Sequence, residues 1–221
     1  HLKPCPSSAY HHDFQRPNCG TRNDDAQLRT VSTFLMTIPG VPLFYYGDEI
    51  GMKFIDGLPS KEGSLLTKGN RAGSRTPMQW DGSEGAGFST AGQDKYYLPI
   101  DDSSYRPNVE TQMANPSSLL HFNRRLLQLR KQYPALGTRG GIRFLYAEAN
   151  KYPLVYERTA NGQRFVIVIN PSGKAVKAEC SFSGAAKEFK PVLVDRTSLK
   201  LVKDKLQINA DGVSYGLFMV N

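Results

Sequence analysis

Gly40–Met52, GVPLFYYGDEIGM, is the stretch of sequence that decides the fold. It begins as a short apolar and aromatic run and stops abruptly at Gly47-Asp48-Glu49. An apolar run of this length, bounded by turn residues, is typical of a strand buried on both faces. We therefore expect a strand at Val41–Tyr46 that opens into a polar loop, which is how an α/β barrel builds a ligand site.

The sequence before and after this run predicts two amphipathic helices. Asp25–Ile38 carries apolar residues at helical spacing, has Asp24 or Asp25 as its N-cap, and ends at Pro39-Gly40. A second helix is expected from Asn115 to about Tyr133, before Pro134. A helix followed closely by a buried strand indicates an α/β architecture. Residues 53–115 read as a long irregular region, and loops of that length tend to be functional.

The chain changes character near residue 139. Short runs rich in Val, Ile, Phe, Tyr and Leu follow, separated by turn residues, and Asn161-Gly162 is a strong hairpin signal. The spacing predicts an antiparallel sandwich in residues 139–221, after a barrel segment in residues 1–138. The expected strands are Ile142–Glu148, Leu154–Thr159, Arg164–Asn170, Val176–Phe182, Phe189–Asp195, Lys205–Asn209 and Val213–Val220.

Composition and charge exclude several classes of function. The 221 residues are 39% hydrophobic and 22% charged, an ordinary globular composition, and no apolar run approaches the ~18–20 residues of a membrane helix. The net charge of +8 invites a nucleic-acid interpretation. The basic residues are dispersed, however, and match no nucleic-acid motif. That interpretation therefore ranks far below the others.

The cysteines and the first residues bear on the cellular compartment. Cys5, Cys19 and Cys180 show no CxxC spacing, which argues against a disulfide framework or a zinc site. A Cys5–Cys19 bridge is the less favoured alternative, and a reducing compartment such as the cytoplasm fits slightly better. The chain opens without Met or a signal-peptide pattern. If a front part of the protein is missing, the absence of a signal-peptide pattern says nothing about the cellular compartment.

Two segments carry residues suited to sugar chemistry. In YHHDFQRP, His12 and Asp13 can bind vicinal hydroxyls, and Arg16 can orient a carboxylate. Alone, such a segment is most often solvated surface, or it binds a metal adventitiously. In a β/α barrel, its place before a helix and a buried strand would put it on the active face. In GSRTPMQWD, Arg75 can direct several donors at hydroxyls, whereas a lone Trp80 more often packs than supports a sugar.

These motifs together resemble the α-amylase family of glycoside hydrolases. The family carries an Asn-His-Asp motif after the seventh barrel strand, often with Arg three residues later. Here it reads His11-His12-Asp13 with Arg16, so that His11 departs from the family pattern. The resemblance implies that Asp13 stabilises the oxocarbenium-like transition state. It also implies that His12 binds neighbouring hydroxyls and that Arg16 shapes the first glucose subsite.

The loop motif places the resemblance in the α-glucosidase-like branch of the family. RTPMQWD resembles the loop after the eighth strand in oligo-α-glucosidases and in trehalose- and trehalulose-forming members. Arg75 is the best candidate of this loop for substrate binding. The resemblance implies that Asp48 and Glu49 are structural rather than catalytic. It covers roughly residues 10–138 and continues weakly through the β-rich end.

The resemblance implies the C-terminal part of a (β/α)8 TIM barrel followed by an antiparallel β-sandwich. A closed barrel needs about 250 residues. The nucleophilic Asp and the acid/base Glu of a retaining glycosidase, about 5–5.5 Å apart, belong to earlier strands of the family. The missing N-terminal half of the barrel is therefore the expected partner, alongside an α-linked oligosaccharide. No cofactor is evident, and any structural calcium would belong to that N-terminal part.

Two explanations of the chain stay open. It is one piece of a retaining α-glucoside hydrolase acting on short α-linked glucans or oligosaccharides, or of a trehalose-synthase-like transglycosidase or isomerase of the same family. Alternatively, it is a non-catalytic fragment that binds carbohydrate. The presence of an N-terminal partner discriminates between them.

Overall fold

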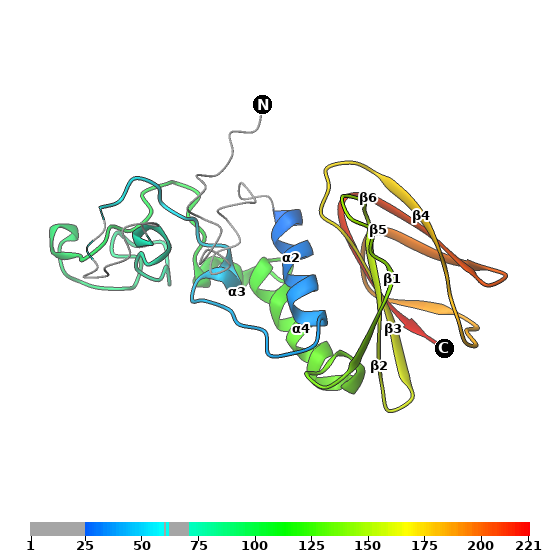
Figure 1. The fold of residues 1–221 in the computed structure, drawn as a ribbon. Helices are drawn as coiled ribbons and strands as arrows, with labels where there is room; N and C mark the ends of the chain where they lie inside the picture. The colour runs from blue at the N-terminus through cyan, green and yellow to red at the C-terminus, as the bar shows by residue number, and fades with distance from the viewer. Residues whose placement is uncertain (1–24, 60, 62–70) are drawn as a thin grey trace. The chain divides into compact units, whose positions relative to one another are not determined.

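The computed structural model describes residues 25–59, 61 and 71–221 of the chain (Figure 1). One compact unit comprises the described residues up to Leu28 together with Leu43–Asn123, and the other comprises Arg29–Pro42 and Arg124–Asn221. None of the described helices is both long and apolar enough to cross a membrane. The described α-helices and strands are α2 (Asp25–Thr37), α3 (Val109–Ala114), α4 (Leu119–Gln132), β1 (Gly141–Tyr146), β2 (Leu154–Ala160), β3 (Gln163–Asn170), β4 (Val176–Ser181), β5 (Phe189–Val202) and β6 (Lys205–Val220). Short 3-10 helices lie at Asp48–Ile50, Ala72–Ser74, Gln93–Lys95 and Pro134–Leu136.

Both predicted helices are confirmed, as α2 and α4, within a few residues of their expected ends. Within the described part of the region predicted to be irregular, residues 53–115, the structure has an α-helix that the periodicity did not indicate, α3. Asn108 caps this helix, because its side chain accepts a hydrogen bond from the Thr111 N–H at 2.9 Å. A helix of six residues is too short for a periodic pattern to emerge from the sequence.

The buried strand predicted at residues 41–46 is wrong for this structure. No described strand pairs with this segment, and Val41 and Leu43 are 82% and 78% exposed. An extended segment becomes a strand only when a neighbour supplies the hydrogen-bond ladder. Among the described residues that neighbour is lacking, so the apolar side chains stay exposed.

The second half of the chain forms a six-stranded antiparallel sheet in the order β1-β2-β3-β6-β4, with β5 paired along β6. Asn161 and Gly162 both have positive φ, 50° and 76°, and they confirm the predicted hairpin between β2 and β3. All six strands share one hydrogen-bonded sheet, so the structure shows an antiparallel sheet, and the packing of two layers into a sandwich stays a prediction. The two strands predicted at the C-terminal end are one continuous strand, β6.

Both faces of β2 and β3 are buried. On one face Val155, Val166 and Val168 belong to a core that includes residues from both halves of β6. On the other face the Tyr156 ring meets Phe34 of α2 edge-on, with ring centroids 6.4 Å apart, and Phe165 meets Tyr133 at 4.9 Å. Strands covered on both sides read as continuous apolar runs, which explains the sequence FVIVI in β3.

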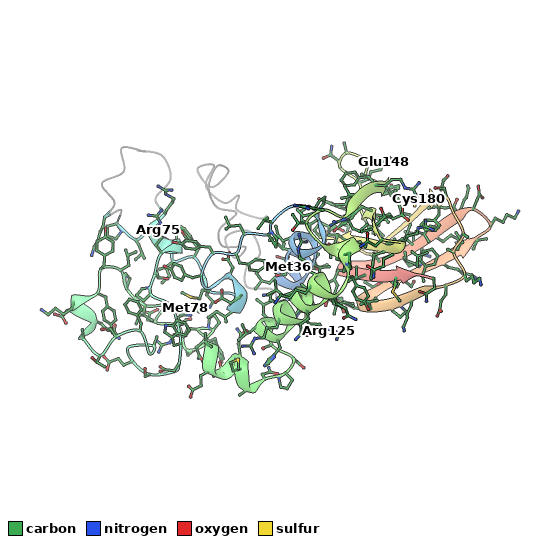
Figure 2. All side chains as sticks on the ribbon, turned by 90° about the horizontal axis from the view of Figure 1, so that it is seen from below. Met36, Arg75, Met78, Arg125, Glu148 and Cys180 are labelled. Atoms are coloured by element: carbon green, nitrogen blue, oxygen red, sulfur yellow. The ribbon has the colours of Figure 1, made fainter. Side chains whose placement is uncertain are left out.

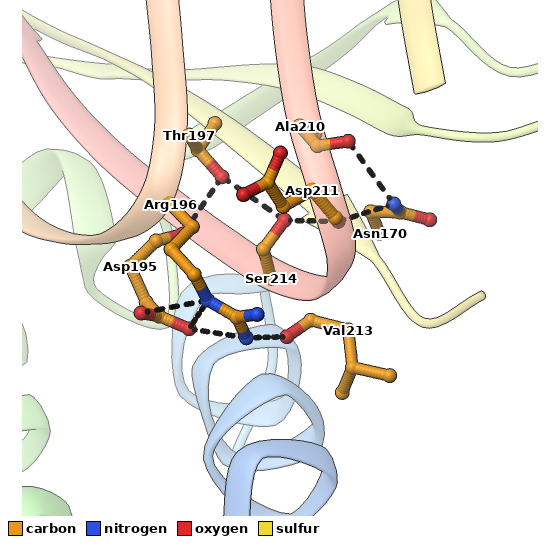
Figure 3. Close-up of polar contacts among 8 residues, drawn as sticks. All are labelled: Asn170, Asp195, Arg196, Thr197, Ala210, Asp211, Val213 and Ser214. Atoms are coloured by element: carbon orange, nitrogen blue, oxygen red, sulfur yellow. Dashed lines mark hydrogen bonds and ion pairs between the residues drawn. The ribbon is translucent and has the colours of Figure 1, made fainter. Parts of the chain in front are cut away.

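The β5–β6 hairpin bends where its pairing skips residues. The register passes from Asp195↔Tyr215 to Thr197↔Ala210, and Arg196 and Val213 adopt positive φ of 43° and 49°. Figure 3 shows the polar contacts that hold this bend. Buried Asn170 donates to the Asp211 carbonyl at 2.6 Å. Because of the bend, the first half of β6 pairs with β4 and the second half pairs with β3.

Candidate functional site

The turn at Gly47–Gly51 is closed by its own two carboxylates. The Tyr45 N–H donates to Asp48 Oδ2 at 3.0 Å, and the Gly47 N–H donates to Glu49 Oε2 at 2.8 Å. Gly47 has φ of +89°, and a Cβ there would lie 2.5 Å from Met52 Sδ. The pair that looks like an acid and a base in the sequence therefore shapes the backbone of the turn.

Two polar side chains from α3 and α4 hold the same turn. Gln112 Nε2 donates to the Ile50 carbonyl at 2.7 Å, and Asn123 Nδ2 donates to the Glu49 carbonyl at 3.2 Å. The Gln112 Oε1 atom also accepts the Leu120 N–H at 3.0 Å, so this side chain bridges the turn and α4. The sequence analysis identified neither Gln112 nor Asn123 as a residue that holds this turn. The signal that could have revealed Asn123 is its polar side chain on the apolar stripe of α4, where it is 3% exposed.

The RTPMQWD loop is fixed to the end of the 41–46 segment. The Tyr46 hydroxyl donates to the Thr76 carbonyl at 2.9 Å. Before it, Gly73 passes Ile55 so closely that a Cβ would lie 2.1 Å from the Ile55 carbonyl oxygen. The Arg75 N–H closes the turn by donating to the Ala72 carbonyl at 3.0 Å. The half-buried Arg75, labelled in Figure 2, therefore starts from a well-defined backbone position.

Gln79 and Trp80 connect this loop to the start of α3. Their carbonyls accept the N–H groups of Val109 and Glu110 at 3.1 and 2.9 Å. Gln79 is 1% exposed, and its Nε2 donates to the Pro107 carbonyl at 2.5 Å. Trp80 is 50% exposed, so the expected packing role accounts for only part of its ring. The exposed part offers an apolar face.

Asp81 organises the turn that follows Trp80. Its Oδ1 accepts the Ser83 hydroxyl at 2.5 Å and the Ser83 N–H at 2.9 Å. These hydrogen bonds lower the pKa of Asp81, and the positive charge of Arg106 contributes less. Arg106 in turn donates to the Ser83 carbonyl. Asp81 is thus engaged in turn structure.

The loop also exposes aromatic rings. Trp80, Phe88, Tyr97 and Tyr105 are each at least half exposed, from 50% to 89%. Phe88 packs edge-on against Tyr96, with ring centroids 6.1 Å apart. Aromatic faces next to hydrogen-bonding groups suit a ligand that has apolar and hydroxyl-bearing sides.

The other predicted site residues lie outside the described residues. These residues are Asp13, His12 and Arg16. The alternative Cys5–Cys19 bridge also lies outside the described residues. Their roles stay predictions, as does that of Arg75. In the part of the chain that the structure covers, no group of three or more His, Cys, Asp or Glu side chains is placed to hold a metal ion.

Comparisons with known proteins point to one family. A family model described as the catalytic domain of α-amylase matches residues 8–139. Trehalose synthase from Thermus thermophilus is 39% identical over 153 residues, which are 67% of this chain and 15% of that protein. Oligo-1,6-glucosidase from Parageobacillus thermoglucosidasius is 31% identical over 200 residues, 76% of this chain and 34% of that protein. The chain thus spans about a third or less of these relatives.

A solved structure supports the same fold. The trehalulose synthase from Pseudomonas mesoacidophila superposes with a TM-score of 0.74 over 94% of this chain and 42% of that one. At 21% identity this likeness concerns the fold alone.

Proposed function

Because the chain belongs to the α-amylase family, we propose that it is the C-terminal part of a retaining α-glucoside hydrolase. Its substrates in this proposal are short α-linked glucans or oligosaccharides. The observation that carries the proposal is the family match over residues 8–139, which includes both the HHD segment and the RTPMQWD loop. The likeness to an oligo-1,6-glucosidase supports hydrolysis as the reaction.

In this proposal the chain supplies four residues to the sugar site. Asp13 stabilises the developing positive charge of the oxocarbenium-like transition state, where a carboxylate acts most strongly. His12 binds neighbouring hydroxyls, and Arg16 shapes the subsite. Arg75 donates hydrogen bonds to the sugar from the loop that Tyr46 ties down. The nucleophile and the acid/base belong to the N-terminal part of the barrel.

The partner in this proposal is that N-terminal half of the barrel. The exposed apolar side chains of Val41 and Leu43 support it, because an exposed extended segment can accept a neighbouring strand. Residues 1–138 then form the C-terminal segment of a TIM barrel, and residues 139–221 form a β-sandwich domain. A core shared by both halves of β6 supports the sandwich, with Leu206 from one half and Phe218 from the other.

The proposal predicts that Asp13→Asn disables the complete enzyme, meaning this chain together with the N-terminal half. We expect kcat to fall by about 10²–10⁴, because the amide loses the charge that acts in the transition state. The measurement is the release of 4-nitrophenol from an α-glucoside, with circular dichroism to check the fold. Asp102→Asn, at an exposed carboxylate, is the matched control. Near-normal turnover in the Asp13 variant would remove Asp13 from the mechanism.

A second candidate is glucosyl transfer or isomerisation, and the trehalose synthase among the relatives favours it. In that reaction a second sugar, rather than water, takes the glucosyl group from the covalent intermediate. Product analysis after incubation with maltose separates the two, because hydrolysis gives only glucose whereas transfer gives a new disaccharide. If maltose binds but neither product forms, the result supports the alternative of a non-catalytic fragment that binds carbohydrate.

A further inference from the structure

Arg158 of β2 is fully buried, yet no carboxylate of the described residues pairs with it. All its partners are backbone carbonyls. Nε donates to Gly141 at 3.0 Å, Nη2 donates to Gly137 at 2.7 Å and Gly140 at 3.0 Å, and Nη1 donates to Thr37. A buried guanidinium is very unfavourable unless its donors are satisfied. Arg158 is therefore placed to serve these carbonyls.

Arg130 of α4 also donates hydrogen bonds at the C-terminal end of α2, where Arg158 binds the Thr37 carbonyl. Its Nη1 donates to the carbonyls of Met36 and Ile38 at 2.6 and 3.1 Å, and its Nη2 donates to the Gly40 carbonyl. The last carbonyls of a helix have no partner within the helix and carry its negative dipole end. Two guanidiniums thus neutralise the C-terminal end of α2, Arg158 from the sheet and Arg130 from a neighbouring helix.

Further contacts attach the end of α2 to the sheet and its flanks. The Tyr156 hydroxyl lies 2.5 Å from Thr37 Oγ1, which itself donates to the Thr33 carbonyl at 2.6 Å. Beyond the helix, the Gly40 N–H donates to the Thr138 carbonyl at 3.2 Å. Burial raises the pKa of Tyr156, so its hydroxyl stays protonated and able to donate. The backbone is held from Thr37 to Gly40, directly before the 41–46 segment.

We propose that Arg158 is a positioning residue through which the C-terminal sheet, together with Arg130, fixes the point where the 41–46 segment begins. The loop that carries Arg75 follows this segment along the chain, so we expect that loop to depend on where the segment begins. An apolar side chain at position 158 would fill the space but remove all four of these hydrogen bonds, and of the four carbonyls Gly137 also accepts the Gly140 N–H at 3.3 Å. We call the hydrogen bonds of Arg158 and Arg130 to the backbone of residues 36–40 the clamp. The proposed link to sugar binding rests on the proposed function, whereas the clamp itself does not.

The clamp is tested by hydrogen exchange on the full chain carrying Arg158→Met, which keeps the length of the side chain and removes its donors. We expect amide exchange in residues 34–41 to accelerate about tenfold or more, while residues 164–170 of the same sheet exchange as before. Arg125→Met is the matched control, because Arg125 also donates to a carbonyl, that of Val192 at 3.0 Å, but is exposed. Unchanged exchange in residues 34–41, or equal acceleration everywhere, would overturn the clamp.

The link to the sugar site is tested by kinetics of the complete enzyme. If Arg158 positions the loop, every Arg158→Met molecule binds sugar less well, and we expect KM to rise about tenfold. A merely structural role would reduce the active fraction and hence the apparent kcat at constant KM. Arg158→Lys retains the charge and should recover part of the KM change. An unchanged KM in Arg158→Met would overturn the link to the site.

The two experiments fail separately. If the wild-type enzyme shows no activity on α-glucosides, the proposed function fails, while the exchange experiment still decides whether the clamp exists.

Discussion

Asp48 and Glu49 show, at the scale of single residues, how sequence chemistry can mislead. Two adjacent carboxylates at the end of an apolar run suggest acid/base catalysis. In the structure each accepts a nearby backbone N–H, Asp48 that of Tyr45 at 3.0 Å and Glu49 that of Gly47 at 2.8 Å. A carboxylate so engaged stabilises the turn through charge-assisted hydrogen bonds. The same turn depends on Gly47, whose φ of +89° favours glycine.

The importance of Gly47 can be measured against two matched glycines. Gly47→Ala should destabilise the chain by about 2–4 kcal/mol, because it combines left-handed strain with a clash against buried Met52. Gly57→Ala, with φ of +76° and open space, should lose only about 1 kcal/mol. Gly82→Ala, which has neither problem, should be neutral. Urea unfolding measures all three, and any other order contradicts the explanation.

The titration of Asp81 tests a second local interaction. Its pKa is lowered chiefly by the Ser83 hydroxyl, so Ser83→Ala should raise it toward the ordinary value. Because the folded-state pKa lies below the unfolded one, the associated stability is present above the unfolded pKa. It is lost as the pH falls through the folded pKa. Carbon NMR of the carboxyl group measures the shift. Ser89→Ala is the control and should leave the Asp81 titration unchanged.

At the scale of elements, one carboxylate ties three strands together. Glu157 of β2 is 4% exposed and accepts from Arg143 of β1 at 2.9 Å and from Arg164 of β3 at 2.8 Å. Both arginines also reach the segment after β4, through Ser183. The central position of Glu157 makes it the common carboxylate partner of both arginines.

Replacing this carboxylate should weaken the sheet. Glu157→Gln removes the charge and leaves two arginines without their counterion, so we expect a loss of about 1–3 kcal/mol in the free energy of unfolding. Chemical denaturation followed by circular dichroism measures it. Glu179→Gln, whose pair with Lys205 is exposed, should leave the midpoint unchanged. An equal effect of the two substitutions would show that burial of Glu157 is irrelevant.

At the scale of the whole molecule, activity should depend on assembly. The chain alone should release no glucose from α-glucosides, because the nucleophile and the acid/base lie elsewhere in the proposed enzyme. Addition of the N-terminal half of the barrel should restore turnover and give a one-to-one complex. Light scattering coupled to size exclusion, with a parallel glucoside assay, measures both. Turnover by the purified chain alone would contradict this division of the site.

Much of the fold could be predicted from the sequence because the signals are local. The apolar spacing predicted α2 and α4, and Asn161-Gly162 predicted the hairpin between β2 and β3. The break predicted between the strands Lys205–Asn209 and Val213–Val220, which contains Asp211-Gly212, was wrong, since β6 runs through it. A bulge opposite Arg196 absorbs these residues without ending the strand, and nothing in the local sequence announces that pairing.

The sequence by itself determined the family, the two long helices, the strand-rich end and the loop that carries Arg75. Each depends on residue types at fixed spacing along the chain. Only the tertiary structure decided that Gln112 and Asn123 hold the Gly47–Gly51 turn and that Arg158 serves the end of α2. These contacts join residues 62 to 121 positions apart. The packing of the elements decides which carbonyl a buried donor meets. The spacing of residue types along the chain does not encode such a contact between residues far apart in the sequence.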